Sequence, residues 1–265
     1  MGESIFTNQK YLKENQYHKS DNLNARIKLH ELFTVTDTPW FAWVYDHLAL
    51  QSNQHILELG SGTGRLWLEN LSKLPNDCKI NLSDLSAGML VEIQGKIKDQ
   101  RFSLMCMDAQ NINFPNNHFD LIIANHMLYH VPDLSAALIE ICKVLKPTGK
   151  LVAATNGIHH MEALYDLLHE FNPNIVSRKP LLNFNLENGE MLLSPFFSNV
   201  KRYDFASALH VTEIQPLLDY YSSMQTMGVD FNQYDQVKFS VFLEDKLQND
   251  GKIIIKKAQG LFVAS

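Results

Sequence analysis

The sequence predicts an α/β fold built on a doubly wound, mainly parallel sheet, and two observations lead to this prediction. First, five short runs are enriched in apolar residues such as Ile, Leu and Val, several of them at consecutive positions, which is typical of strands buried on both faces. These runs are residues 55–59, 79–84, 102–108, 119–125 and 150–155. Second, amphipathic stretches with helical spacing separate the runs, and right-handed crossovers then place helices over both faces of the sheet.

Two of the helices between these strands are well marked. Residues 133–146 present one apolar face, with Asp133 or Ser135 as a candidate N-cap. Residues 86–100 present another, with Ser86 as the candidate N-cap. The apolar positions of the second helix are Met89, Leu90, Ile93 and Ile97.

The flanks of this central region differ from it. Residues 1–50 indicate polar helices with an aromatic cluster near their end. Downstream, the spacing predicts further helices, one additional strand over 200–211, and a final strand that follows a turn at Asn249-Asp250-Gly251. The expected helices are residues 159–171, 184–197, 212–224 and 234–248.

Length and charge restrict the function. A chain of 265 residues fits a single domain, expected here over 1–265. Its 23 basic and 29 acidic side chains give a net charge of −6, which disfavours a nucleic-acid binder that depends on phosphate contacts. We expect no membrane partner and a cytoplasmic location, because we find neither a signal-peptide pattern nor an apolar run near the roughly 18 residues of a membrane span.

A glycine-rich loop carries the most information about function. Residues 56–67, ILELGSGTGRLW, read as an apolar strand, a loop with three glycines and the start of a helix. A dinucleotide site of the pattern G-x-G-x-x-G would place its third glycine at Arg65 or at Trp67, so NAD and FAD are disfavoured. The loop also lacks the Lys-Ser/Thr ending of a P-loop.

The pattern E-x-G-x-G-x-G, here Glu58 to Gly64, resembles that of the class I S-adenosylmethionine-dependent methyltransferases at every fixed position. Residues 83–90, 108–109, 119–133 and 138–151 resemble the later motifs of this family in order and spacing, with Thr148-Gly149 in place of the usual Gly-Gly. The resemblance covers about residues 54–155. It implies S-adenosyl-L-methionine as cofactor, no metal, and cofactor contacts from Glu58, Gly60, Ser61, Gly62, Gly64, Asp84, Leu85, Met89, Asp108, Ala109 and Asn125.

The family resemblance also implies a Rossmann-like, seven-stranded mixed sheet with an antiparallel last strand, an N-terminal helical lid and a helical insert. We therefore expect residues 1–50 to form the lid and 51–158 the cofactor-binding core. Residues 159–250 would supply helices and a strand around the acceptor pocket, and 251–265 the final strand.

Histidines supply the candidate catalytic groups, because methyl transfer needs a base only when the nucleophile must lose a proton. His160 and His130 follow predicted strands and are candidate general bases, with packing in the core as the alternative for His130. Candidate substrate or lid residues are Tyr17, Arg26, His30, His126 and Tyr129. A solvated helix face is the alternative for the three in the lid.

These observations predict methyl transfer from S-adenosylmethionine to a small or medium organic acceptor by in-line displacement, in which positioning supplies most of the catalysis. The alternatives are an RNA or protein methyltransferase and a non-catalytic S-adenosylmethionine-binding protein. The expected partner is the small-molecule acceptor, and the chain is expected to act as a monomer or homodimer.

Overall fold

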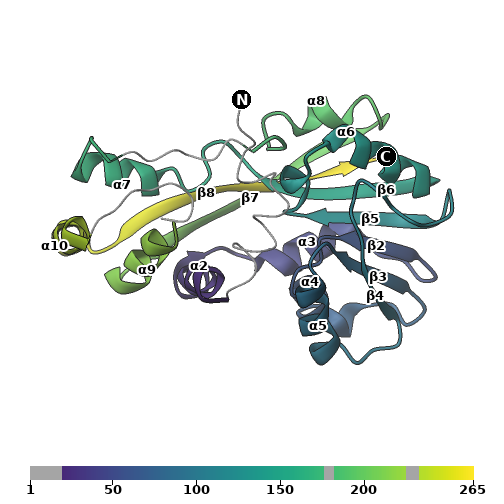
Figure 1. Ribbon diagram of the computed structural model, residues 1–265, viewed down its shortest axis with the longest axis horizontal. Helices are drawn as coiled ribbons and strands as arrows, with labels where there is room; N and C mark the ends of the chain where they lie inside the picture. The colour runs from purple at the N-terminus through teal and green to yellow at the C-terminus, as the bar shows by residue number, and fades with distance from the viewer. Residues whose placement is uncertain (1–19, 176–181, 225–232) are drawn as a thin grey trace.

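The computed structural model describes residues 20–175, 182–224 and 233–265, and in them a mixed eight-stranded sheet in the order β1-β7-β8-β6-β5-β2-β3-β4 (Figure 1). The expected fold class is confirmed, with seven strands of five or more residues plus the two-residue β1. The central strands are parallel, while β8 runs antiparallel to both β6 and β7. The strands are β1 (Thr34–Val35), β2 (His55–Leu59), β3 (Lys79–Asp84), β4 (Phe102–Cys106), β5 (Phe119–Asn125), β6 (Leu145–Asn156), β7 (Val200–Val211) and β8 (Ile253–Ala264).

Two strand boundaries differ from the sequence prediction. β4 ends at Cys106 rather than at residue 108, and Asp108 then begins a turn in which its carbonyl accepts a hydrogen bond from the amide of Asn111. β6 begins at Leu145, five residues early, because Leu145 already pairs with Phe119 before the register shifts. The residues around Pro147 thus lie in the strand rather than in a helix–strand turn.

Each face of the central strands has its own core. On one face, β2, β5 and β6 pack against α6 (Leu134–Val144) and α8 (Gly189–Leu193). On the other, the same strands and β3 pack against α3 (Trp40–Leu48), α4 (Arg65–Leu68) and α5 (Ala87–Lys96). The alternation is visible along β2, where Leu57 belongs to the first core and Ile56 to the second. Short 3-10 segments, η2 (Leu71–Lys73) and η3 (Leu128–His130), complete the central region.

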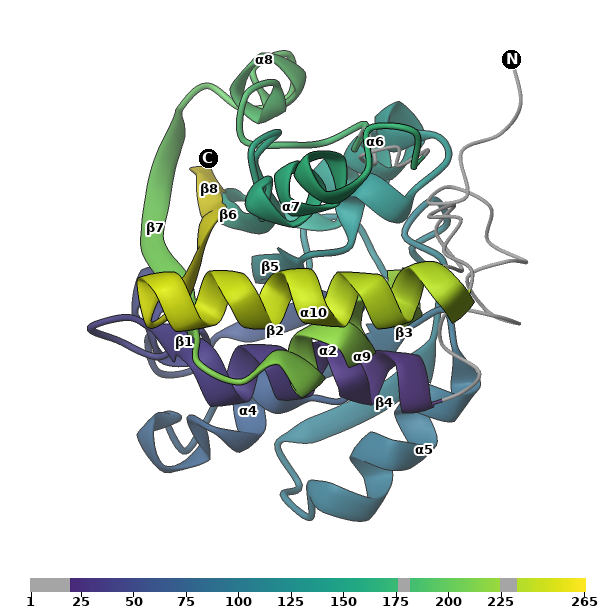
Figure 2. The same cartoon turned by 90° about the vertical axis from the view of Figure 1, so that its left-hand side faces the viewer.

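β7 and β8 are twelve residues long and reach well beyond the shorter strands. Around this outer length gather α2 (Ser20–Phe33), α7 (Ala163–Phe171), α9 (Ile214–Met224) and α10 (Gln233–Asp250), as Figures 1 and 2 show. A third core, with Phe239 and Leu209 fully buried, holds these helices on the strands. In Figure 2, α10 crosses in front, with α2 and α9 side by side below it.

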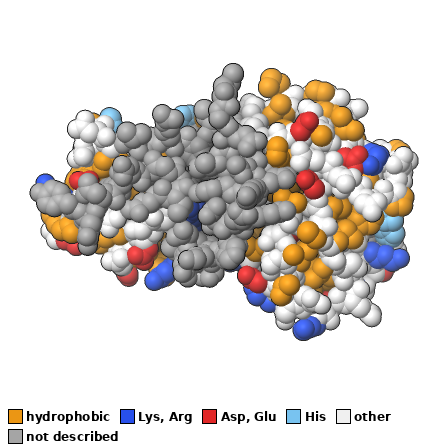
Figure 3. All heavy atoms as spheres, viewed as in Figure 1, with side chains coloured by type: hydrophobic (Ala, Val, Ile, Leu, Met, Phe, Trp, Pro, Cys, Tyr) orange, Lys and Arg blue, Asp and Glu red, His pale blue; other side chains and the backbone are white. Residues whose placement is uncertain are grey.

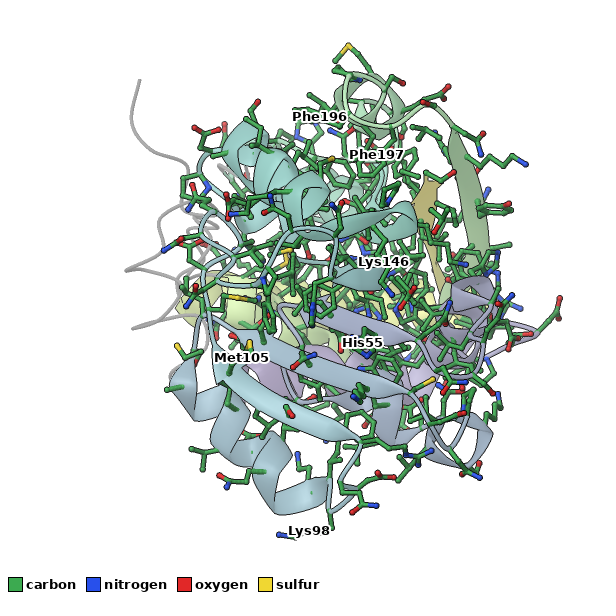
Figure 4. The ribbon with its side chains drawn as sticks, turned by 90° about the vertical axis from the view of Figure 1, so that its right-hand side faces the viewer. His55, Lys98, Met105, Lys146, Phe196 and Phe197 are labelled. Atoms are coloured by element: carbon green, nitrogen blue, oxygen red, sulfur yellow. The ribbon has the colours of Figure 1, made fainter. Side chains whose placement is uncertain are left out.

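The carboxylate of Asp120 links the amino ends of the parallel strands β2, β5 and β6 by hydrogen bonds. Asp120 on β5 accepts hydrogen bonds from the backbone amide of His55 at 2.8 Å and from the Nζ atom of Lys146, also at 2.8 Å. His55 and Lys146 lie at the end of the sheet seen in Figure 4. Asp120 thus holds three adjacent strands together at that end of the sheet.

The expected N-terminal lid is described only in part. Tyr17 lies outside the described residues, whereas α2 packs along α9 through Leu29 and Phe33. Among the helices of the described ranges, none has the length and apolar character needed to cross a membrane.

We predict that Gly260→Ala destabilises the fold by about 1–3 kcal/mol, because overpacking of a well-packed interior costs that much. Gly260 lies opposite Asp204 in the β7–β8 pair, and an added Cβ would overlap the carbonyl oxygen of Tyr203. Urea unfolding measures the change. Gly95→Ala is the matched control: it places a methyl group in open space on α5 and should stabilise by about 0.5–1 kcal/mol. Equal stability of the two variants would contradict the prediction.

Candidate functional site

A cavity of about 160 Å³ lies at the carboxyl ends of β2, β3, β4 and β5. Open α/β sheets bind their ligands at this edge. The lining joins the glycine loop after β2 to the ends of β3 and β4 and to the loop after β5. It consists of Leu59, Gly60, Gly62, Asp84, Leu85, Met89, Met107, Asp108, Ala109, His126, Met127, His130 and Val131.

The three loop glycines all adopt the left-handed backbone conformation, with φ of 66°, 55° and 72° at Gly60, Gly62 and Gly64. A side chain at Gly60 would come within 2.7 Å of Met127, whereas a Cβ at Gly62 would meet no atom within 4 Å. Gly60 therefore permits close packing of two loops. Gly62 leaves bare backbone facing an open part of the cavity.

Asp84, at the end of β3, holds the loop in place. Its Oδ2 accepts a hydrogen bond from the amide of Gly62 at 2.9 Å, and its Oδ1 accepts one from the amide of Ser86 at 2.8 Å. Burial raises the pKa of this carboxyl, and the bonds from Ser86 and Gly62 oppose that rise. The amide of Ser61 donates to the carbonyl of Ser83 at 2.8 Å, so the loop is bound to the strand end at two consecutive residues.

Four of the other expected cofactor residues also form part of the cavity wall. Leu85 and Met89 follow β3 along the chain, Asp108 and Ala109 follow β4, and all four line the cavity. The carboxylate of Asp108 accepts a hydrogen bond from the amide of Gln110 at 2.9 Å. Three of these side chains are apolar, so this wall suits a flat, weakly polar group.

Glu58 does not line the cavity. Only 2% of its surface is exposed, and its Oε2 accepts a 2.6 Å hydrogen bond from the indole Nε1 of Trp67 behind the glycine loop. Burial raises the pKa of Glu58 to about 7, a rise that the Trp67 bond opposes and the nearby charge of Asp84 increases. Gly64 also stays out of the lining, because it packs against Ile93 and Ile97 of α5.

Two buried oxygen atoms near the cavity have no hydrogen-bond partner among the described residues. They are the Oγ of Ser61, in the glycine loop, and the Oδ1 of Asn125, at the end of β5. Buried polar groups are nearly always paired in folded proteins. Unpaired oxygens beside a cavity therefore indicate a ligand with hydrogen-bond donors.

The loop after β5 supplies two histidines to the cavity, His126 and His130. His126 has φ of 55°, which is uncommon for a residue with a Cβ. Burial, together with the neighbouring charges of His130 and Lys257, lowers the pKa of His126 to about 4. Tyr129 packs against the core beside α6 and does not line the cavity.

His160 and His30 do not line this cavity, but each lies close enough to His126 for their charges to interact. The Nδ1 of His160 lies 3.1 Å from the carbonyl oxygen of Ala258, so Nδ1 carries the proton and Nε2 is the free base. Arg26 lies elsewhere: its guanidinium donates to the hydroxyl and the carbonyl of Ser223, both at 3.0 Å.

The sequence prediction missed four lining residues, Leu59, Met107, Met127 and Val131, and it missed Lys257 on β8. The position of Lys257 could have been predicted from the alternation of side chains along a strand. Successive strand residues face opposite sides of a sheet, so one member of the pair Lys256–Lys257 must point inward. The structure leaves Lys256 exposed and Lys257 partly buried.

The comparisons with known proteins agree with this geometry. The family described as "Methyltransferase domain" matches residues 57–153. A ubiquinone/menaquinone biosynthesis C-methyltransferase of Rickettsia massiliae is 34% identical over 107 residues, which cover 38% of this chain and 43% of that protein. A demethylmenaquinone methyltransferase of Lactiplantibacillus plantarum is 33% identical over 136 residues, covering 50% and 55%. The chain thus spans about half the length of the curated relatives it matches.

Solved structures share the fold. The phosphoethanolamine N-methyltransferase 2 of Haemonchus contortus, solved with S-adenosyl-L-methionine, superposes with a TM-score of 0.60 at 19% identity over 99% of this chain and 60% of that one. The [4+2]-cyclase SpnF gives 0.57 at 14% identity over 96% of both chains. At such low identity these similarities concern the fold alone.

We predict that the free energy of unfolding of the native protein falls as the pH rises from about 4.5 to about 7, and that Glu58→Gln removes this component. The folded state binds a proton that the unfolded state, with an ordinary Glu pKa of 4.5, has already released. The pKa rise to about 7 corresponds to about 3 kcal/mol.

Urea unfolding between pH 4.5 and 8 measures this difference. Glu92→Gln is the control, because Glu92 is exposed on α5 and forms only a surface ion pair with Lys96. A Glu58→Gln profile parallel to that of the native protein would contradict the assignment.

Proposed function

We propose that this protein, whose residues 57–153 match the family described as "Methyltransferase domain", is a class I S-adenosylmethionine-dependent methyltransferase that transfers the methyl group of this cofactor to a small organic acceptor. The observation that carries the proposal is the cavity itself. It is lined by a glycine loop that exposes backbone at Gly62 and by the strand-end carboxylate of Asp84, which holds this loop.

The residues present fit the cofactor. Asp84 has carboxylate lone pairs left to accept from ribose hydroxyl groups, since each oxygen takes one backbone amide. Leu85, Met89 and Ala109 offer apolar contacts for adenine. The unpaired oxygens of Ser61 and Asn125 suit the ammonium of the methionine end.

Glu58 has a different task in this proposal. Its carboxylate is bonded to Trp67 behind the glycine loop, so it orients the loop rather than touching the cavity. The full proposed set of cofactor residues remains Glu58, Gly60, Ser61, Gly62, Gly64, Asp84, Leu85, Met89, Asp108, Ala109 and Asn125.

The bound cofactor supplies an electrophilic methyl group on a positively charged sulfur. The protein then has to align the acceptor with that methyl group and exclude water, which can contribute about 7–11 kcal/mol. When the acceptor must lose a proton, the Nε2 of His160 is the candidate base, because its Nδ1 proton is committed to the carbonyl of Ala258. His130, in the cavity lining, is the second candidate.

The named relatives support a carbon atom as the acceptor. The Rickettsia protein is named a C-methyltransferase of quinone biosynthesis, and the Lactiplantibacillus protein a demethylmenaquinone methyltransferase. We therefore propose an electron-rich ring carbon of a small molecule. The net charge of −6 supports this over an RNA acceptor, and on the face in Figure 3 the visible described Lys and Arg side chains are scattered rather than continuous.

A direct test has two arms. Isothermal titration with S-adenosylmethionine, S-adenosylhomocysteine and NAD measures cofactor choice, and we expect binding of the first two alone. Release of S-adenosylhomocysteine in the presence of hydroquinones and other small phenols measures methyl transfer. Cofactor binding without turnover on any small acceptor would instead favour a non-catalytic cofactor-binding protein, and binding of NAD alone would refute the proposal.

We predict that Asp84→Asn weakens S-adenosylhomocysteine binding about ten- to a hundredfold, the usual range for losing charged hydrogen bonds to a ligand. Titration calorimetry measures the affinity, and thermal unfolding checks that the variant folds. Asp99→Asn is the matched control, because Asp99 pairs with Arg101 in the turn before β4, outside the cavity lining. Equal affinities of the two variants would contradict the role of Asp84.

A further inference from the structure

Four nitrogen-bearing side chains from separate parts of the fold lie near one another beside the cavity. They are His30 on α2, His126 after β5, His160 after β6 and Lys257 on β8. The group is close enough for mutual electrostatic effects: His126, His30 and Lys257 each lower the pKa of His160. We refer to these four side chains as the basic cluster.

The basic cluster has unsatisfied hydrogen-bonding groups. Both ring nitrogens of His126 and the Nδ1 of His30 are buried without a partner among the described residues. The Nζ of Lys257 donates to the hydroxyl of Thr34 at 2.9 Å, and in the described part of the chain no carboxylate pairs with it. A partly buried amine and buried imidazole nitrogens that have no such partners among the described residues are unfavourable unless a ligand supplies the missing charge and hydrogen bonds.

His126 joins the basic cluster to the cofactor cavity. Its side chain lines that cavity, and its charge interacts with those of His30, His160 and Lys257. Its left-handed backbone is held by a 3.0 Å hydrogen bond from its amide to the carbonyl of Ala154, and Trp40 covers its ring at a centroid distance of 5.1 Å. A strained conformation kept in place by its surroundings is a common feature of ligand sites.

We propose that the basic cluster binds an ionised oxygen of the methyl acceptor, so that the acceptor is an acidic molecule, a phenol or a carboxylic acid. This inference rests on the proposed function, which makes the bound molecule the methyl acceptor. The basic cluster itself indicates that this molecule is negatively charged.

The protonation states of the four groups favour an anion. Burial lowers the pKa of Lys257 to about 8, so the amine is still mostly protonated at neutral pH. The histidines are neutral there, because burial lowers the pKa of His30 to about 3 and that of His126 to about 4 and takes that of His160 well below its ordinary value. The protonated amine of Lys257 can pair with one negative oxygen, and the neutral imidazoles of His126 and His30, which have unpartnered ring nitrogens, can donate further hydrogen bonds to it.

The test uses the protein loaded with S-adenosylhomocysteine and 4-nitrophenol as probe, because the ionised phenol has its own absorption band. We expect the protein to bind the phenolate and to lower the pKa of the bound phenol, with affinity falling as the pH rises through about 8 and Lys257 loses its proton. Benzoate as a competitor distinguishes a carboxylate from a phenolate acceptor, and benzamide is its uncharged counterpart.

Three variants test whether phenolate binding depends on the charge of Lys257 in the basic cluster. Lys257→Met should reduce phenolate affinity about tenfold or more, and Lys257→Arg should restore most of it. Lys256→Met is the matched control, since this neighbour on β8 is exposed. All three should keep the S-adenosylhomocysteine affinity of the parent, and thermal unfolding checks that each variant is folded.

The outcomes also separate this inference from the proposed function. Binding of S-adenosylhomocysteine with no binding of phenolate or benzoate, or with equal binding by Lys257→Met and Lys256→Met, would overturn the acidic-acceptor site alone. A loss of S-adenosylhomocysteine affinity in Lys257→Met would also overturn it, because the cluster would then serve the cofactor. Failure of the parent protein to bind S-adenosylhomocysteine would refute the proposed function instead.

Discussion

The site depends on the hydrogen bonds that fasten the glycine loop to the end of β3. The amide of Gly62 donates to the carboxylate of Asp84, and the amide of Ser61 donates to the carbonyl of Ser83. The hydroxyl of Ser83 in turn donates to the carbonyl of Glu58 on β2. A loop with three left-handed residues would otherwise have many alternative conformations, so these bonds select the one that borders the cavity.

The same constraint explains why polar groups are buried here. Asp84 and Glu58 are both held in surroundings that raise their pKa values, which is unfavourable for the charged forms. Hydrogen-bond donors offset this effect for each carboxylate: backbone amides for Asp84 and the Trp67 indole for Glu58. Burial of these two carboxyl groups is locally destabilising, and their hydrogen bonds make the cavity wall at the glycine loop rigid and partly polar.

The long antiparallel pair β7–β8 supports the part of the structure outside the central parallel strands. It carries α2, α7, α9 and α10 on its outer length, and it places Lys257 beside histidines from α2 and from the loops after β5 and β6. The cofactor side of the site is made by the central parallel strands, whereas the proposed acceptor side is made by elements that surround them. Differences in acceptor between related proteins can therefore arise without change in the glycine loop.

Much of the central region could be predicted from the sequence, because its signals are local. Runs such as 55–59, 79–84 and 119–125 appear as strands with the expected bounds, because the Ile and Leu side chains in each are buried in the cores that cover the sheet. The glycine spacing placed Gly60 and Gly62, and the strand-end position placed Asp84, at the cavity. In each case the residue acts through its own backbone conformation or its place at a strand end.

Only the tertiary structure decided which distant side chains meet. Glu58 points to Trp67 rather than into the cavity, Arg26 binds Ser223, and Lys257 joins three histidines from other elements. These outcomes depend on how α2, β8 and the loops pack together, and that packing sums many weak contacts that no local pattern encodes. The sequence by itself determined the α/β core and its cofactor loop, because each acts through local backbone geometry. The charge and the hydrogen-bond partners of the basic cluster followed from packing between segments far apart in the chain.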